Sequence, residues 1–323
     1  MSAPLLQVSN LRKYFQETTS SLRHYLPGRR RVVKAVDGVS LTLQPQETLG
    51  IVGESGCGKS TLGRTILRLL EPTAGQIIFK GQDITHLPQA RLRPLRQHMQ
   101  IVYQNPFSSL NPRKRVEAIL RQPLEVHGFK GNLTERVEEL LQAVGLPAEA
   151  RHKYPHQFSG GQQQRIAIAR ALATHPEFIV ADEVTSALDV SIQAQIINLM
   201  ARLQQEFGLA YLFISHNLGV IKHISHRIAV MYLGQIVEQA ATETLFAHPR
   251  HPYTQILMSA IPTPNVEVNW QPQLLVGDVP SPVNLPSGCR FHPRCPIALA
   301  ECAQQEPELR QVAEGHWVAC HLA

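Results

Sequence analysis

Residues 53–61 read GESGCGKST, which matches the spacing G-x-x-x-x-G-K-[ST]. The apolar run TLGIVG at 48–53 leads into this stretch and predicts a short buried strand, and a helix is expected to follow it. A glycine-rich loop between a strand and a helix turns its backbone N–H groups inward around a phosphate, and the helix N-terminus adds partial positive charge. The stretch therefore predicts a nucleoside triphosphate site, and a strand followed by a helix favours an α/β fold.

The residues of this loop have separate expected roles. The three glycines allow the tight turn, Lys59 reaches the β and γ oxygens of ATP, and Ser60 offers its hydroxyl to Mg²⁺. Cys57 is expected to be a small side chain that fills a loop position, and the alternative is an oxidisable thiol of lowered pKa beside the helix N-terminus. The predicted ATP-binding residues here are Gly53, Glu54, Ser55, Gly56, Cys57, Gly58, Lys59, Ser60 and Thr61.

A second element carries two carboxylates. The sequence FIVADE at 178–183 predicts a buried strand that delivers Asp182 and Glu183 at its C-terminal end, the edge where ligands bind in open α/β sheets. Asp182 is expected to hold Mg²⁺ through water, and Glu183 to orient and deprotonate an attacking water. The alternative is that both carboxylates are merely solvated at a strand end, and the presence of the phosphate loop argues against it.

A third motif lies between these two. The sequence FSGGQQQR at 158–165 places a serine and two glycines at the start of a helix, which is another anion site. One nucleotide does not need two such sites from a single chain. Here the sequence resembles the ATP-binding cassette (ABC) family, whose signature is matched by Ser159, Gly160, Gly161 and Gln162. The resemblance implies a head-to-tail dimer in which this signature covers the γ-phosphate of ATP held by the partner cassette.

Four more positions match stations of the same family. Tyr14 in RKYF corresponds to the aromatic that stacks on adenine, although an ordinary strand aromatic is the alternative. Gln104 in VYQNP corresponds to the glutamine that touches Mg²⁺ and the water. Asp189 in SALD corresponds to the D-loop, and the resemblance implies that it contacts ATP in trans. His216 in FISHN corresponds to the switch histidine at the γ-phosphate, whereas a lone histidine there would be structural.

The match to the cassette covers about residues 5–240 and has two departures. The family usually has proline where Val184 stands and aspartate where Asn217 stands; both differences concern the local loops and remove no group that does chemistry. The resemblance implies a P-loop NTPase of the ABC type, with a RecA-like core, an antiparallel β subdomain and a helical subdomain at about 106–158. Within that insert, LTERVEELLQAVGL predicts a helix with Thr134 as its N-cap.

The composition and charge limit the classes of protein to consider. The chain has 323 residues and a formal charge of +6, with basic clusters at 29–31, 91–98 and 111–115. These clusters fit a solvated face or an anionic partner. Because the chain has one intact cassette, unlike the ABC proteins that act on nucleic acid, we expect no nucleic acid partner. No apolar run is long enough for a membrane span, the best being IAVMYLGQIV at 228–237. The N-terminus does not resemble a signal peptide, so reduced cysteines are expected.

The residues after the cassette indicate which kind of ABC protein the chain resembles. HPRHPYTQILMSAIP at 248–262 resembles the segment after the cassette in ATPases of peptide and nickel importers, and its matching core is Arg250, His251, Pro252, Tyr253 and Thr254. The chain thus resembles the F-type ATPase of a bacterial dipeptide or oligopeptide importer. Other substrates such as nickel or opines stay open, as does a soluble ABC ATPase without membrane partners.

That resemblance implies partners and a location. In the family, the subunit pairs with a D-type ATPase beneath two transmembrane permease subunits, which a periplasmic substrate-binding protein serves, and it sits at the cytoplasmic face of the inner membrane. We expect QNPFSSLNPR at 104–113 and the residues to about 130 to contact a permease, with Phe107 and Leu110 as test positions. The expected domains are a cassette at 1–240 and an extension at 241–323, joined through a proline-rich connector at 262–286.

The extension holds four of the five cysteines. Cys289, Cys295, Cys302 and Cys320 contain no C-x₂₋₄-C pair, which is the usual sign of structural zinc, and match neither ferredoxin spacing. The family resemblance implies a [4Fe-4S] cluster in this cysteine-rich appendage. Zinc, reduced thiols and a redox disulfide remain open alternatives. Three nearby histidines are further ligand candidates that we expect to be bystanders: His292, His316 and His321.

Overall fold

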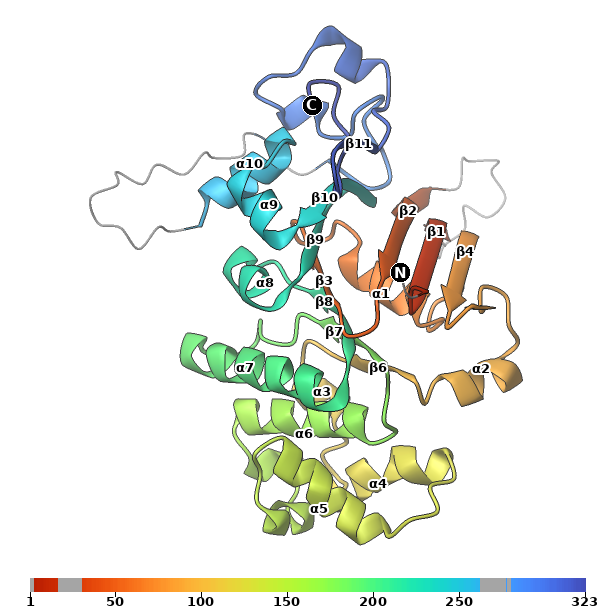
Figure 1. Cartoon of the computed structure of the whole chain (residues 1–323), viewed down its shortest axis with the longest axis vertical. Coiled ribbons are helices and arrows are strands. Elements are labelled where there is room, and N and C mark those ends of the chain that lie inside the picture. The colour runs from red at the N-terminus through yellow and green to blue at the C-terminus, as the bar shows by residue number, and fades with distance from the viewer. Residues whose placement is uncertain (1–2, 17–30, 262–276, 278–279) are drawn as a thin grey trace, which may run out of the picture. The chain divides into compact units, whose positions relative to one another are not determined.

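The computed structural model describes residues 3–16, 31–261, 277 and 280–323 (Figure 1). The chain forms two compact units whose segments alternate along the sequence. The first unit consists of Met1–Leu5, Leu43–Gly50 and His86–Ser215, and the second of Leu6–Thr42, Ile51–Thr85 and His216–Ala323. The chain crosses between them within the strand β3 (Thr48–Val52), which is the strand predicted before the phosphate loop.

The first unit contains a parallel sheet. β6 (Met99–Val102) pairs with β7 (Phe178–Asp182), and β7 pairs with β8 (Ala210–Ile214) in the register Phe178 to Ala210. Every residue of β7 and β8 is buried, as the continuous apolar runs predict. The helix α7 (Val190–Phe207) connects these two strands and makes the crossover that a parallel pair requires.

Helices form the remainder of the first unit. They are α2 (Gln89–Leu95), α3 (Pro106–Ser109), α4 (Val116–Val126), α5 (Leu133–Ala143) and α6 (Gly160–Leu172), with 3₁₀ turns at Ala148–His152 and Pro155–Gln157. Figure 1 shows α4, α5 and α6 packed together. The expected N-cap of α5 is wrong by two residues, because Asn132 Oδ1 accepts hydrogen bonds from the N–H groups of Thr134 and Glu135.

The second unit contains an antiparallel sheet of strand order β2-β1-β4-β5. Its strands are β1 (Leu6–Gln16), β2 (Val32–Leu43), β4 (Ala74–Phe79) and β5 (Gln82–Asp83). β1 runs antiparallel to β4 from the pair Leu6 and Phe79 onward, and alternate residues at its start are buried. This is the antiparallel β subdomain that the sequence predicts.

The second unit also contains the strand order β11-β12-β10-β9. These strands are β9 (Arg227–Tyr232), β10 (Gln235–Ala241), β11 (Arg310–Ala313) and β12 (His316–Val318). The apolar run at 228–237 is therefore two antiparallel strands joined at Leu233 and Gly234, which both have positive φ. We call residues 280–323 the C-terminal segment, and its strand β12 pairs directly with β10.

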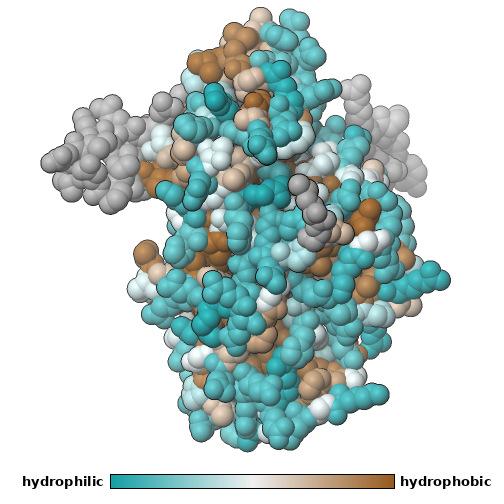
Figure 2. All heavy atoms as spheres, in the orientation of Figure 1, coloured by the Kyte–Doolittle hydropathy of each residue, from teal (hydrophilic) through white to brown (hydrophobic). Residues whose placement is uncertain are grey.

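Short helices complete the second unit. They are α1 (Lys59–Ile66), α8 (Leu218–Ile224), α9 (Thr242–Ala247) and α10 (Pro252–Ser259), with 3₁₀ turns at His292–Arg294 and Ala300–Ala303. The predicted proline-rich connector lies largely outside the described residues, as do the first two arginines of the 29–31 cluster. None of the helices in the described part of the chain has the length and hydropathy needed to cross a bilayer. Figure 2 shows a mainly hydrophilic face on which hydrophobic residues form small separate groups.

Candidate functional site

The phosphate loop lies between β3 and α1, as predicted, and two of its glycines are required by backbone geometry. Gly53 has φ 153° and Gly58, the N-cap of α1, has φ 107°. A Cβ at Gly53 would lie 2.1 Å from the carbonyl oxygen of Met231, and one at Gly58 would lie 2.0 Å from that of Ala35. Both backbones pass so close to neighbouring carbonyl groups that no side chain fits.

Lys59 is folded over this loop. Its ammonium donates hydrogen bonds of 2.8 Å to the carbonyl oxygens of Gly53 and Glu54, and the side chain is buried. The Cys57 thiol lies 3.8 Å from the same ammonium, and burial raises its pKa despite that positive charge. The structure thus agrees with Cys57 as a small filling side chain and contradicts a lowered pKa. Ser55 and Gly56 are exposed, and Ser60 and Thr61 are half-buried.

Tyr14 is on β1 and its phenol is held by a carboxylate. The hydroxyl donates to Asp37, and burial together with this partner raises the pKa of Tyr14. Asp37 also accepts a hydrogen bond from Arg290; burial of Asp37 acts against ionisation, but the bonds from Tyr14 and Arg290 hold its pKa below the usual value. The ammonium of Lys34 lies 5.7 Å from the centroid of the Tyr14 ring.

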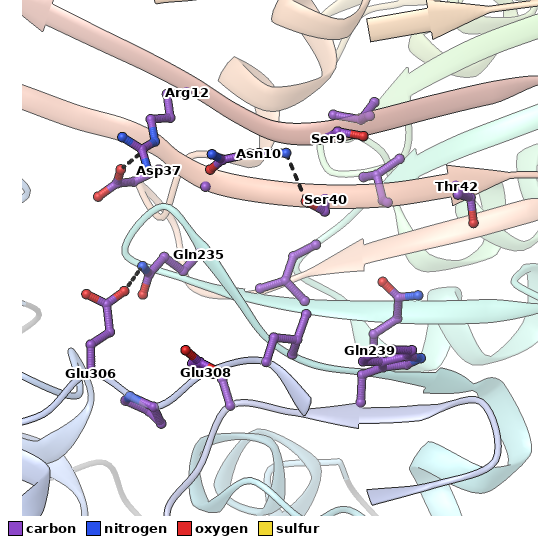
Figure 3. A pocket seen from close by; sticks show the side chains of 18 of the residues that line it. Ser9, Asn10, Arg12, Asp37, Ser40, Thr42, Gln235, Gln239, Glu306 and Glu308 are labelled. Atoms are coloured by element: carbon purple, nitrogen blue, oxygen red, sulfur yellow. Dashed lines mark hydrogen bonds and ion pairs between the residues drawn. The ribbon is translucent and has the colours of Figure 1, made fainter. Parts of the chain in front are cut away.

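Tyr14 lines a polar cleft of about 1100 Å³ in the second unit, between β1, β2 and residues 306–319 of the C-terminal segment. Figure 3 shows Arg12 and Asp37 facing one another at one end of this cleft and Gln235 hydrogen-bonded to Glu306 at the same end. Sequence reasoning did not find Asp37, because a single aspartate in a strand carries no motif.

Two predicted catalytic side chains meet in the first unit. Asp182 is the buried last residue of β7, and Glu183 follows it with φ 51°, a left-handed backbone that is uncommon outside glycine. The N–H of Glu183 donates to the carbonyl of Ile214 at the end of β8. The side-chain amide of Gln104 donates a 2.9 Å hydrogen bond to the Glu183 carboxylate.

The signature motif opens α6. Ser159 is the N-cap, and its hydroxyl accepts from the N–H of Gln162 while the Gln162 side chain accepts from the N–H of Ser159. Ser159 and Gln162 are exposed, so this helix start is open to a ligand. A Cβ at Gly161 would lie 2.6 Å from Ile192 Cγ2, whereas Gly160 has ordinary space. Asp189 is the exposed N-cap residue of α7.

The switch position belongs to the second unit. His216 is exposed just before α8, and Asn217 caps that helix by accepting from the N–H groups of Gly219 and Val220. Asparagine therefore performs the capping that an aspartate would perform. Val184, the other departure, is buried in the first unit. Tyr14, the phosphate loop and His216 lie in the second unit, whereas the carboxylates, Gln104, the signature and Asp189 lie in the first.

The four cysteines of the C-terminal segment are free thiols. Cys302 and Cys320 are buried, Cys289 and Cys295 half-buried, and the N–H of Cys289 donates to the carbonyl of Cys302. Burial raises the pKa of Cys289 to about 11, and Cys302 and Cys320 add to the effect. Among the described residues, no group of three or more His, Cys, Asp or Glu side chains is placed to hold a metal ion. The expected cluster or zinc site is thus unsupported.

The three candidate histidines have other partners. His316 donates to the buried Glu238, and the Nδ1 atom of His292 to the carbonyl of Cys289. His321 donates to the carbonyl of Gln305. That the three are bystanders stays a prediction.

Known proteins resemble the chain over most of its length. Residues 36–186 match the family described as ABC transporter, and residues 237–302 match the one described as oligopeptide/dipeptide transporter, C-terminal region. The oligopeptide transport ATP-binding protein AppF of Bacillus subtilis is 52% identical over 98% of this chain and 97% of its own. A putative peptide import ATP-binding protein of Brucella ovis is 49% identical over 98% of this chain and 97% of its own.

Solved structures agree with this likeness. A dimeric post-hydrolysis structure of the ATP-binding cassette MJ0796, bound to ADP and Pi, has a TM-score of 0.63 and 28% identity, and covers 73% of this chain and 98% of that one. The structure of cbiO1 from Clostridium perfringens, part of the complex cbiONQ, has a TM-score of 0.64 and 25% identity, and covers 76% and 92%. The chain has the ABC cassette fold and belongs to the family of ABC transporter ATP-binding proteins that carry the oligopeptide/dipeptide transporter C-terminal region.

Proposed function

We propose that the chain is the ATP-hydrolysing subunit of a bacterial ABC importer that takes up dipeptides or oligopeptides. The observation that carries the proposal is the hydrogen bond between Gln104 and Glu183 at the end of a buried parallel strand, in a chain that also has a phosphate loop. The names of the relatives support peptides as the substrate class.

The side chains divide the hydrolysis between them. Lys59 leaves the carbonyl groups of its own loop to meet the β and γ oxygens of ATP, and Tyr14 stacks on the adenine. Glu183, oriented by Gln104, takes a proton from the attacking water, and His216 contacts the γ-phosphate. Hydroxyl, amide and carboxylate oxygens from Ser60, Gln104 and Asp182 suit Mg²⁺, which neutralises phosphate charge when bound.

The exposed signature supports a cassette dimer. Ser159, Gly160, Gly161 and Gln162 present a helix N-terminus that the chain's own phosphate loop does not need, so we assign them, with Asp189, to ATP bound by a partner cassette. We propose a paralogous D-type ATPase as that partner. Closure of the dimer on ATP and its release after hydrolysis would drive the transport cycle.

Phe107 is the exposed one of the two positions predicted to contact a permease. It lies within α3 and is 57% exposed, whereas Leu110 is only 2% exposed and packs inside. The prediction of Leu110 as a contact residue is therefore wrong. We propose that Phe107 and residues to about 130 contact one of two permease subunits, which hold the chain at the cytoplasmic face of the inner membrane and receive substrate from a periplasmic binding protein.

The test of the function uses the chain with its membrane partners. The subunits that co-purify from membranes are identified and reconstituted in vesicles, and ATP-dependent uptake of a labelled dipeptide, an oligopeptide and Ni²⁺ is compared. Peptide uptake that is lost in Glu183→Gln supports the proposal. Uptake of Ni²⁺ alone would assign the same motor to a metal importer, and ATP hydrolysis without any membrane partner would indicate a soluble ATPase.

A separate proposal concerns the cysteines, with Cys289, Cys295, Cys302 and Cys320 as ligands of a [4Fe-4S] cluster. Its support is that all four are free thiols in one segment, where the N–H of Cys289 donates to the carbonyl of Cys302. As folded here they do not form a ligand set, so the segment would have to close around the cluster, and no step of hydrolysis depends on it. Iron and sulfide in anaerobically purified protein would support it, and one zinc per chain without sulfide would reject it.

A further inference from the structure

The C-terminal segment reaches the phosphate loop through Arg294. This arginine, next to Cys295, forms a two-pronged ion pair with Glu54: Nη1 lies 2.7 Å from Oε2, and Nη2 lies 3.1 Å from Oε1. The Arg294 side chain is 5% exposed and that of Glu54 22%. Such a bidentate, largely desolvated pair fixes the direction of the carboxylate as well as its charge.

The backbone of Glu54 is held as firmly as its side chain. Its N–H donates a 2.8 Å hydrogen bond to the hydroxyl of Tyr253 at the start of α10, and its carbonyl accepts from Lys59. The buried Tyr253 ring packs against Tyr232 and Phe291, with centroids 4.7 and 5.4 Å apart. The second residue of the phosphate loop is thus anchored by Tyr253 and Arg294, which both follow the cassette in the sequence.

A second arginine of the same segment reaches the predicted adenine-stacking residue. Arg290, next to Cys289, is buried and donates to the carbonyl of Leu233 and to the carboxylate of Asp37. Asp37 in turn accepts the hydroxyl proton of Tyr14. Arg290, Asp37 and Tyr14 therefore form one hydrogen-bonded chain, which restricts the position of the tyrosine ring at its far end.

We propose that Arg294 and Arg290 are positioning residues for ATP, so that the C-terminal segment sets nucleotide affinity. The inference rests on the proposed function. Glu54 is a negative charge within a loop that must receive a triphosphate, and an unpaired carboxylate there would repel it. Arg294 neutralises this charge and turns it aside, whereas Arg290 acts through Asp37 on the stacking ring. One arginine thus serves the phosphate end of ATP and the other serves the base.

The experiment compares two probes, Mg·ATP and Mg·tripolyphosphate, on the full chain. Dissociation constants are measured for wild type, Arg294→Gln, Arg294→Lys, Glu54→Gln, the double variant Arg294→Gln with Glu54→Gln, and Arg290→Gln. Arg310→Gln is the matched control, since Arg310 is an exposed arginine of the same segment on β11. The melting temperature without nucleotide is recorded for each sample.

Arg294→Gln is expected to weaken binding of both probes at least about fivefold, Arg294→Lys less so. Adding Glu54→Gln should restore most of the affinity, because the repelling charge is gone. Arg290→Gln should weaken ATP binding and leave tripolyphosphate binding unchanged. The electrostatic role of Arg294 is overturned if its loss has no effect or if Glu54→Gln fails to restore binding. The role of Arg290 is overturned if both probes weaken equally. A wild-type chain that binds no ATP would instead reject the proposed function.

Discussion

The side-chain amide of Gln104 donates a hydrogen bond to the carboxylate of Glu183, although the two residues are 79 positions apart in the sequence. Glu183 also has a left-handed backbone, with φ 51°, and its N–H is tied to the carbonyl of Ile214. Side-chain bond, backbone conformation and backbone bond together fix where the carboxylate points. Strained backbone that is held by its surroundings is often found where chemistry occurs.

The first prediction tests Glu183 as the general base. Glu183→Gln keeps the size of the side chain and removes its basicity, so kcat for ATP should fall by about 10² to 10⁴. ATP binding should be unchanged, because the residue is expected to act on the water. Phosphate release and nucleotide binding are measured on the same preparation. A variant that hydrolyses ATP at the wild-type rate would contradict the assignment.

The second prediction concerns Gln104. Gln104→Ala removes the hydrogen bond that orients the charged Glu183 carboxylate, so kcat should fall roughly tenfold. Gln100→Ala is the matched control, because the Gln100 side chain donates to the carbonyl of Arg96 instead. Equal losses in the two variants would show that Gln104 has no special role.

The third prediction separates two candidate caps of α5. Asn132→Ala should lower the free energy of unfolding by about 1 kcal/mol, because it leaves the N–H groups of Thr134 and Glu135 without their acceptor. Thr134→Ala should have a much smaller effect. Chemical denaturation of both variants checks this, and a larger loss from Thr134→Ala would favour the cap expected from the sequence.

This difference illustrates which parts of the fold a sequence can predict. The strand 178–182 is buried throughout and apolar up to its last residue, Asp182, so its pattern is unambiguous. Asn132 and Thr134 are both good capping residues two positions apart, and only the backbone geometry distinguishes them. The run at 228–237 reads as continuous in the sequence, because the turn at Leu233 and Gly234 that divides it into two strands contains no polar residue.

The candidate site likewise contains residues that the sequence predicts and residues that it does not. Motif residues such as Lys59 and Glu183 were predicted because their chemistry depends on local spacing. The partners Arg294 and Glu54 are 240 positions apart, and nothing in either local sequence indicates the other. The burial of Leu110 could not be predicted from the sequence either, because a single leucine after a short helical turn can face the core or the solvent.

The fourth prediction compares the two signature glycines. Gly161→Ala places a methyl group 2.6 Å from Ile192, so α6 or α7 must shift and stability should fall by roughly 1–3 kcal/mol. Gly160→Ala meets only ordinary contacts with Leu188 and Phe107, so its stability should change little. Thermal unfolding of both variants tests the contrast, and similar melting temperatures would show that Ile192 adapts without cost.

The last prediction concerns pH and His251, the N-cap of α10. Burial lowers the pKa of His251 to about 4 from 6.5, and its Nδ1 accepts a hydrogen bond from the N–H of Tyr253. Below pH 6.5 His251 is protonated in the unfolded chain but stays neutral in the folded chain. The contribution of His251 to the free energy of unfolding is therefore fully present above pH 6.5. It is lost as the pH falls toward 4, by up to about 3 kcal/mol.

His251→Asn separates this histidine from other titrating groups, because asparagine keeps a capping acceptor but does not ionise. Denaturant unfolding of wild type and variant is measured at pH 7.5 and pH 5. Wild type should lose more stability than the variant between these two values, since only wild type carries a buried imidazole that must be protonated on unfolding. An equal loss in the two proteins would contradict the prediction, because it would mean that the pKa of His251 is the same in the folded and the unfolded chain.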